Sequence, residues 1–198
     1  MNHFVFCVAL LFVFHLTASA QKKEYNCLTL QTESEVQVSG SANVGGFRCH
    51  TDPREPEHLI PSCFIRSDDT IKISEVQFEI PVDGFSCGNP LVVKDLKEVL
   101  ESKVYPNIKF DLHHLEAKQI QDNFFKGRVI ATTEVKGVKK DVSFDAEVDE
   151  LNPNYFMISG RIPIFLSWYG IAQPSRLFGL LKLEDQIDVC FELYFTKN

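Results

Sequence analysis

The chain has 198 residues, a formal net charge of −7 and 17 phenylalanines against two methionines. This length suits one domain with a sizeable core, and the acidic charge without any lysine and arginine block argues against binding to nucleic acid or to an anionic membrane surface. The phenylalanine content is typical of either a large apolar core or an apolar cavity.

Residues 1–20 have the pattern of a secretory signal peptide. Residues 4–16 form an apolar run, and Ala18, Ser19 and Ala20 provide small side chains for cleavage before Gln21. The run is too short to cross a bilayer comfortably, and no later segment reaches that length. We therefore expect a periplasmic or secreted protein with no membrane span, whose mature domain comprises residues 21–198.

Strand signals begin the mature chain, at residues 27–30 and 35–41. Asparagine and glycines within residues 40–46 predict a turn into an extended piece that ends at Cys49. Residues 51–62 carry three prolines and predict a surface loop. Apolar side chains then alternate between Ile71 and Ile80, with a predicted bulge near Glu75, where the alternation slips.

A single amphipathic helix is predicted after Cys87. Its apolar residues fall near helical spacing, and they are Leu91, Leu96, Val99, Leu100 and Val104. Pro106 disfavours helix at Tyr105, so we expect the helix to end just before this proline. A lone helix beside a run of strands would cover the mouth of a sheet that curls on itself.

The second half of the chain reads as a meander of strands, at residues 107–115, 125–135, 142–148, 155–164 and 186–195. Turns are predicted at Lys136-Gly137 and at residues 152–154. About eight strands joined by short turns favour a mainly β fold, an eight-stranded antiparallel barrel with a short covering helix, over a sandwich.

Side chains that could carry chemistry are few. His113, His114 and Glu116 suggest a metal site, but neighbours in a strand point to opposite faces, and His114 and Glu116 alone are too few ligands. His50 and His58 lie near cysteines, yet a disulfide would remove the thiols that a cysteine nucleophile needs. We expect no catalytic residue, no metal and no cofactor.

The mature chain keeps five cysteines, so at least one is free or pairs with a second copy in a homodimer. Two pairings are open, Cys49 with Cys63 and Cys49 with Cys87, and the second would fix the covering helix. The alternative is that the cysteines serve as small buried apolar residues.

Alternation assigns an apolar row to the interior of the barrel, and we take it as the candidate ligand-binding set. It comprises Phe78, Ile80, Phe110, Leu112, Val129, Ala131, Phe144, Ala146, Ile162, Ile164, Val189 and Phe191. Trp168 is added as a residue that either caps a cavity or packs structurally. An eight-stranded barrel can be just filled or can hold one small ligand, so the strand count leaves a filled core and a cavity both open.

The order and spacing of several motifs resemble the YceI-like family. The matching residues are Asp95, Leu96, Lys97, Leu100, Tyr105, Pro106, Ile108, Phe110, Val135, Gly137, Val138, Lys139, Val142, Phe144, Gly160, Ile162, Gly170 and Ile171. The resemblance extends over about residues 34–195, and it departs at residues 166–169, where many members have an acidic or arginine-rich turn.

Members of that family are secreted or periplasmic lipocalin-like barrels that bind polyisoprenoids and other long-chain lipids. The resemblance therefore implies a hollow barrel whose partner is a long-chain apolar lipid, an isoprenoid or a fatty chain. Two other functions stay open, an enzyme for an apolar substrate on the same scaffold, and a structural or interaction module whose phenylalanines fill the barrel.

Overall fold

The computed structural model describes residues 27–43, 45–54, 62–172, 175–176 and 181–197. Its strands are β1 (Leu28–Leu30), β2 (Glu35–Ala42), β3 (Gly46–Thr51), β4 (Cys63–Arg66), β5 (Thr70–Ser74), β6 (Val76–Pro81), β7 (Asn107–Gln121), β8 (Phe124–Val135), β9 (Val138–Asn152), β10 (Tyr155–Phe165), β11 (Ser175–Arg176) and β12 (Leu181–Lys197). The helices are η1 (Val82–Gly84), α1 (Pro90–Val99) and η2 (Leu166–Tyr169).

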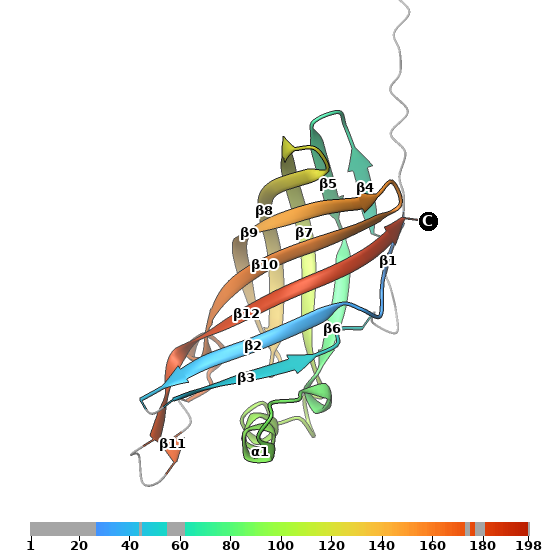
Figure 1. The fold of residues 1–198 in the computed structure, drawn as a ribbon. Helices are drawn as coiled ribbons and strands as arrows, with labels where there is room; N and C mark the ends of the chain where they lie inside the picture. The colour runs from blue at the N-terminus through green and yellow to red at the C-terminus, as the bar shows by residue number, and fades with distance from the viewer. Residues whose placement is uncertain (1–26, 44, 55–61, 173–174, 177–180, 198) are drawn as a thin grey trace, which may run out of the picture.

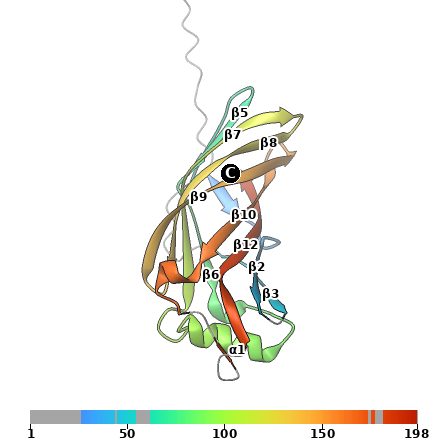
Figure 2. The same ribbon diagram turned by 90° about the vertical axis from the view of Figure 1, so that its left-hand side faces the viewer.

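The strands form one strongly curled antiparallel sheet, with α1 beyond one end of it (Figures 1 and 2). The strand order is β3-β2-β12-β10-β9-β8-β7-β5-β4, while β6 pairs with β7, and β1 and β11 pair with β12. The predicted mainly β fold with one α-helix is confirmed for the described residues.

The predicted number of eight strands is only approximate. Strands β5 and β6 pair with successive parts of β7 and are separated by Glu75, whose φ of 60° breaks the extended backbone near the predicted bulge. If β5 and β6 are counted as one interrupted strand, the path from β3 to this strand contains eight strands. Strands β1, β4 and β11 are additional to these eight.

The ends of this path are linked incompletely. Across the described ranges no continuous ladder joins β3 to β6. Two isolated bridges connect these regions instead, between His50 and Ser86 and between Arg54 and Glu79. Each bridge has two backbone hydrogen bonds of 2.7–2.9 Å between nitrogen and oxygen, so the sheet curls like a barrel without a full closing seam.

The predicted hairpin at Lys136-Gly137 is confirmed and joins β8 to β9. Lys136 and Gly137 have φ angles of 51° and 74°, the pair of positive values that a type I′ turn requires. The predicted turn at residues 152–154 joins β9 to β10, and there the Asn154 backbone N–H donates to the Asn152 side chain at 3.0 Å. These two turns set the register of the meander.

Helix α1 begins as its sequence dictates but ends earlier than predicted. The side chain of Asn89 accepts from the Leu91 backbone N–H at 3.0 Å, and Pro90 occupies the first helical position. The helix ends at Val99, because Glu101 takes a left-handed φ of 52° well before Pro106.

Two predicted members of the buried helix stripe were assigned wrongly. Leu91 and Val104 are 68% and 66% exposed. Leu91 lies in the first turn on the outer side of α1, and Val104 lies beyond the end of the helix. The side chains that pack against the core are Val92, Leu96 and Val99, one helical turn apart.

One of the two predicted disulfides is present. Cys49 in β3 is bonded to Cys87, three residues before α1, whereas Cys63 is free, so the Cys49–Cys63 pairing was wrong. Among the described cysteines, Cys27 and Cys190 are also free. The Cys49–Cys87 bond lies beside the His50–Ser86 bridge and ties the start of the helical segment to β3.

The predicted signal peptide lies outside the described residues. Within the ranges that the structure describes, no helix combines the length and the apolar character needed to cross a bilayer.

Candidate functional site

An apolar cavity of about 270 Å³ is lined by strands of the barrel and by α1, which Figure 1 shows at one end of the curled sheet. Its wall comes from seven strands and from the segments around both 3-10 helices. The main lining side chains are Val38, Ile80, Phe85, Ile108, Phe110, Thr133, Val135, Ile162, Ile164, Leu166, Tyr169, Ile171, Ile187 and Val189. Helix α1 adds Val92, Leu96 and Val99, and Leu100, the residue that follows the helix, also lines the cavity, so the predicted covering role of the helix is met.

Several of the lining residues contributed by α1 and the β2–β3 hairpin are partly exposed, and we define these as the rim of the cavity. They include Val92, Asp95 and Leu96 of the helix and Ala42 and Phe47 of the hairpin, which are half-buried. The Cys49–Cys87 bond connects the two elements that carry the rim.

A row of four phenylalanines crosses the barrel at the inner end of the cavity. Phe78 stacks on Phe110 with ring centroids 4.7 Å apart, and edge contacts follow from Phe110 to Phe144 at 6.2 Å and from Phe144 to Phe191 at 5.5 Å. A Cβ on Gly160 would lie 2.7 Å from the Phe191 ring, so glycine is required for this ring position. We call these four rings the phenylalanine floor.

Beyond the phenylalanine floor the barrel is filled. Phe156 lies between Phe64 and Phe195, at centroid distances of 5.2 and 5.7 Å. The other residues of this region are almost completely buried, and they include Ile71, Ile73, Leu115, Phe125, Val129 and Val148. The interior is therefore hollow in the half next to α1 and solid in the other half.

Two hydroxyl groups form the buried polar contact of the cavity. Thr133 and Tyr169 hydrogen-bond each other at 2.5 Å, and Thr133 also lies 3.3 Å from the Lys140 carbonyl oxygen. Burial raises the pKa of the Tyr169 phenol, against a smaller lowering by the bond to Thr133. Both groups are therefore neutral at ordinary pH. Asp95, at the rim, is the one acidic side chain among the described lining residues.

The predicted inward row is buried except for Val189, which is partly buried, and only part of the row lines the cavity. The five lining members are Ile80, Phe110, Ile162, Ile164 and Val189. Phe78, Phe144 and Phe191 complete the phenylalanine floor, and Ala146 lies beside it. Leu112, Val129 and Ala131 are buried in the core away from the cavity lining.

Trp168 is placed outside the described cavity lining. It is 42% exposed and packs against Phe165 with ring centroids 4.8 Å apart. Its neighbour Tyr169 is the residue that turns inward. In a 3-10 turn neither strand nor helix periodicity predicts which of the two aromatic side chains is buried, so the sequence analysis missed Tyr169.

The histidine pair lies away from the cavity lining. A register shift in β7 between Leu112 and His114 leaves both His113 and His114 half-exposed, so the predicted opposite orientation was wrong. His114 does lie 3.7 Å from Glu116. Among the described residues, no three histidine, cysteine or acidic side chains are grouped to hold a metal ion.

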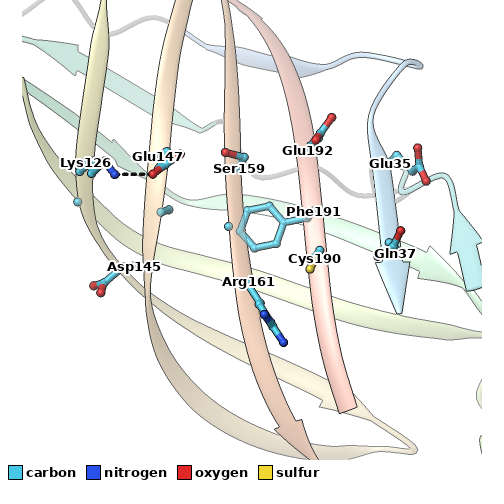
Figure 3. A pocket seen from close by; sticks show the side chains of 13 residues that line it. Glu35, Gln37, Lys126, Asp145, Glu147, Ser159, Arg161, Cys190, Phe191 and Glu192 are labelled. Atoms are coloured by element: carbon cyan, nitrogen blue, oxygen red, sulfur yellow. Dashed lines mark ion pairs between the residues drawn. The ribbon is translucent and has the colours of Figure 1, made fainter. Parts of the chain in front are cut away.

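A second hollow, of about 890 Å³, lies against β2, β8, β9, β10 and β12 (Figure 3). Most of its lining side chains are polar and belong to the opposite strand phase, but Gly127, Ala146, Gly160 and Phe191 also line it. Lys126 points toward Glu147, and their charged atoms are 2.7 Å apart. Arg161 bonds Asp188 at 2.6 Å and lowers the pKa of that carboxyl. These ion pairs belong to a solvated surface, so the apolar cavity is the better candidate site.

The fold and the cavity together define a half-hollow, lipocalin-like antiparallel barrel. The chain belongs to the YceI-like domain family, whose model matches residues 31–195. None of the curated proteins compared with the chain matches it.

Solved structures are similar in fold. Burkholderia cenocepacia BcnA is 16% identical with a TM-score of 0.62, over 84% of this chain and 99% of that chain. A polyisoprenoid-binding domain from Saccharophagus degradans, implicated in plant cell wall breakdown, is 13% identical with a TM-score of 0.61, over 87% and 99%. The Campylobacter jejuni YceI protein is 18% identical with a TM-score of 0.51, over 73% and 90%.

Proposed function

We propose that this protein is an exported lipid-binding protein that sequesters or carries a long-chain isoprenoid or another apolar lipid in the cavity under α1. The observation that carries the proposal is the cavity itself, an opening into the barrel whose described lining is almost entirely aliphatic and aromatic. Membership of the YceI-like family and the polyisoprenoid-binding relative from S. degradans support the same class of ligand.

Burial of a chain can supply the necessary free energy. Each buried methylene contributes about 0.8 kcal/mol, whereas association costs on the order of 4–15 kcal/mol. A short acid would barely offset that cost, but a chain of about ten carbons would, without any charge pair. Binding of this kind selects an apolar chain and discriminates little between headgroups outside the rim.

The proposed role involves no covalent chemistry. The buried polar groups of the cavity are the Thr133 and Tyr169 hydroxyls, and each already has the other as a partner. His113 and His114, the residues considered for catalysis, are placed away from the cavity lining. Turnover of an apolar substrate that is lost on substitution of either histidine would contradict this part of the proposal.

Organic extraction of the purified protein, followed by mass spectrometry, tests the proposed function. We expect a co-purifying apolar lipid and saturable uptake of a fluorescent polyprenyl or fatty probe. The variant Val189→Phe, which places a ring in the cavity, should weaken uptake at least tenfold, because the ring occupies the space of the chain. A clean extract together with no saturable uptake would count against a carrier.

The matched control is Val138→Phe, the same substitution at a residue that is 37% exposed on β9. It should fold and take up the probe as the unchanged protein does. Equal losses in both variants would indicate a general disturbance of the barrel.

Export is tested separately from lipid binding, and so is the formation of a homodimer. If residues 1–20 are a signal peptide, protein recovered outside the cytoplasm will begin at Gln21, which intact-mass measurement detects.

Cys27, which is free and exposed, is the cysteine through which two copies would pair. Non-reducing electrophoresis of Cys27→Ser against the unchanged protein tests such a homodimer.

A further inference from the structure

The phenylalanine floor limits how deep a ligand can enter the barrel. Phe110 lines the cavity, and behind it Phe78 and Phe144 are in ring contact with it. The region beyond is occupied by the Phe64, Phe156 and Phe195 cluster. A chain that enters at the rim therefore meets packed aromatic rings halfway along the barrel.

The volume of the cavity limits the number of chain carbons that it can hold. A water molecule takes a share of about 30 Å³ of the liquid, and a methylene group is of similar size. The cavity of about 270 Å³ therefore has room for roughly nine chain carbons. Carbons beyond this number would remain at or outside the rim, where they lose less contact with water.

The lining of the cavity restricts the buried part of the ligand further. Apart from the Thr133 and Tyr169 hydroxyls and Asp95 at the rim, the described lining side chains are aliphatic and aromatic. A polar group buried along the chain would lose its hydrogen bonds to water, which is unfavourable, so the buried part of the ligand is apolar.

We infer that the cavity takes an apolar chain of which about nine carbons are buried, and that carbons beyond this length add almost nothing to affinity. This inference rests on the proposed function and specifies its ligand. It predicts a ceiling in the dependence of affinity on chain length, rather than a preference for the longest lipid.

Straight-chain primary alcohols from hexanol to tetradecanol, titrated against a cavity-bound fluorescent probe, test the ceiling. The dissociation constant should fall about fourfold per added methylene while the cavity fills, and should level off near nine or ten carbons. A fourfold gain that continues through tetradecanol would overturn the inference and leave the proposed function standing. No binding of any chain would instead remove the proposed function.

Two phenylalanine substitutions locate the ceiling. Phe144→Leu shortens a ring of the phenylalanine floor and should move the levelling to longer chains. The same change at Phe156, in the filled half, should leave it in place. Phe144→Ala would enlarge the shift, and Phe144→Leu keeps the test usable if that variant does not fold. A ceiling that stays at the same length in both Phe144 variants would show that the floor does not set it.

Discussion

Tyr169 shows how one side chain joins the stability of the barrel to the character of its cavity. Its phenol is buried, contacts Thr133 and lines the hollow half of the interior. Replacing Tyr169 with phenylalanine removes one hydrogen bond but leaves Thr133 its contact with the Lys140 carbonyl. We expect a loss of about 1 kcal/mol in the free energy of unfolding, measured by urea denaturation at pH 7.

The same residue gives the barrel a dependence on alkaline pH. Burial raises the pKa of Tyr169 in the folded state, so the stabilising contribution is complete below the unfolded value near pH 10. Above it the unfolded chain loses its proton first, and stability falls as pH rises. The fall in unfolding free energy between pH 9 and 11 should be smaller in Tyr169→Phe than in the unchanged protein.

Tyr155 provides the comparison for that pH series. Its hydrogen bond to Glu33 raises its pKa to about 12, but the side chain lies at the surface. In the unchanged protein both tyrosines therefore contribute to the fall in unfolding free energy at alkaline pH. Tyr155→Phe should keep the fall that Tyr169 causes. Identical pH profiles in Tyr169→Phe and in the unchanged protein would contradict the assignment.

Among the elements, the segment from Cys87 through α1 depends most on a covalent link. The Cys49–Cys87 bond spans 38 residues, and closing a loop of that length in the unfolded chain stabilises the fold by about 4 kcal/mol in the chain-entropy account. The double variant Cys49→Ala, Cys87→Ala should lose 2–4 kcal/mol of unfolding free energy. Its probe affinity should fall as well, because the rim elements are no longer tied together.

Cys63→Ala serves as the control for the disulfide, since Cys63 is a half-buried free thiol. It should change stability by much less and leave probe binding unaltered. Equal affinity in the double variant and this control would mean that the backbone bridge of His50 and Ser86 suffices to hold the rim.

The elements also differ in how far the sequence specifies them. Strands such as β9 follow from strict alternation, as Val142, Phe144, Ala146 and Val148 are buried on one face. The end of α1 was not predictable, because it depends on a left-handed Glu101 rather than on Pro106. Glu101 also pairs with Lys136 at 2.7 Å, a contact between distant segments that local propensity does not include.

The candidate site was predictable in outline for a similar reason. Period two identifies which side chains face inward, so the whole predicted inward row is inside the barrel. This alternation does not predict at which depth in the barrel the rings of different strands contact one another. The contact of Phe144 with Phe110 and Phe191 depends on cross-strand register and on the missing side chain of Gly160. That contact separates lining residues from core residues.

At the scale of the whole molecule, the two halves of the interior have different tasks. The filled half stabilises the curled sheet, and the hollow half offers apolar surface that only a ligand covers. A substitution should therefore affect mainly stability or mainly binding, depending on its side of the phenylalanine floor. Phe156→Ala should lower the free energy of unfolding by about 3–5 kcal/mol, while the folded fraction binds decanol with unchanged affinity.

Ligand linkage provides the measurement for this division. A ligand that binds only the folded state at a hundred times its dissociation constant raises the unfolding free energy by about 2.7 kcal/mol. Decanol at a hundred times its dissociation constant should raise the unfolding free energy by this amount in the unchanged protein and in the Phe156 variant. The same decanol concentration should raise it less in Val189→Phe. Should Phe156→Ala fail to fold, Phe156→Leu carries the same expectation with a smaller loss of stability. If the Phe156 substitution lowered affinity and stability together, the halves would be coupled through the phenylalanine floor, and the barrel would act as one continuous core.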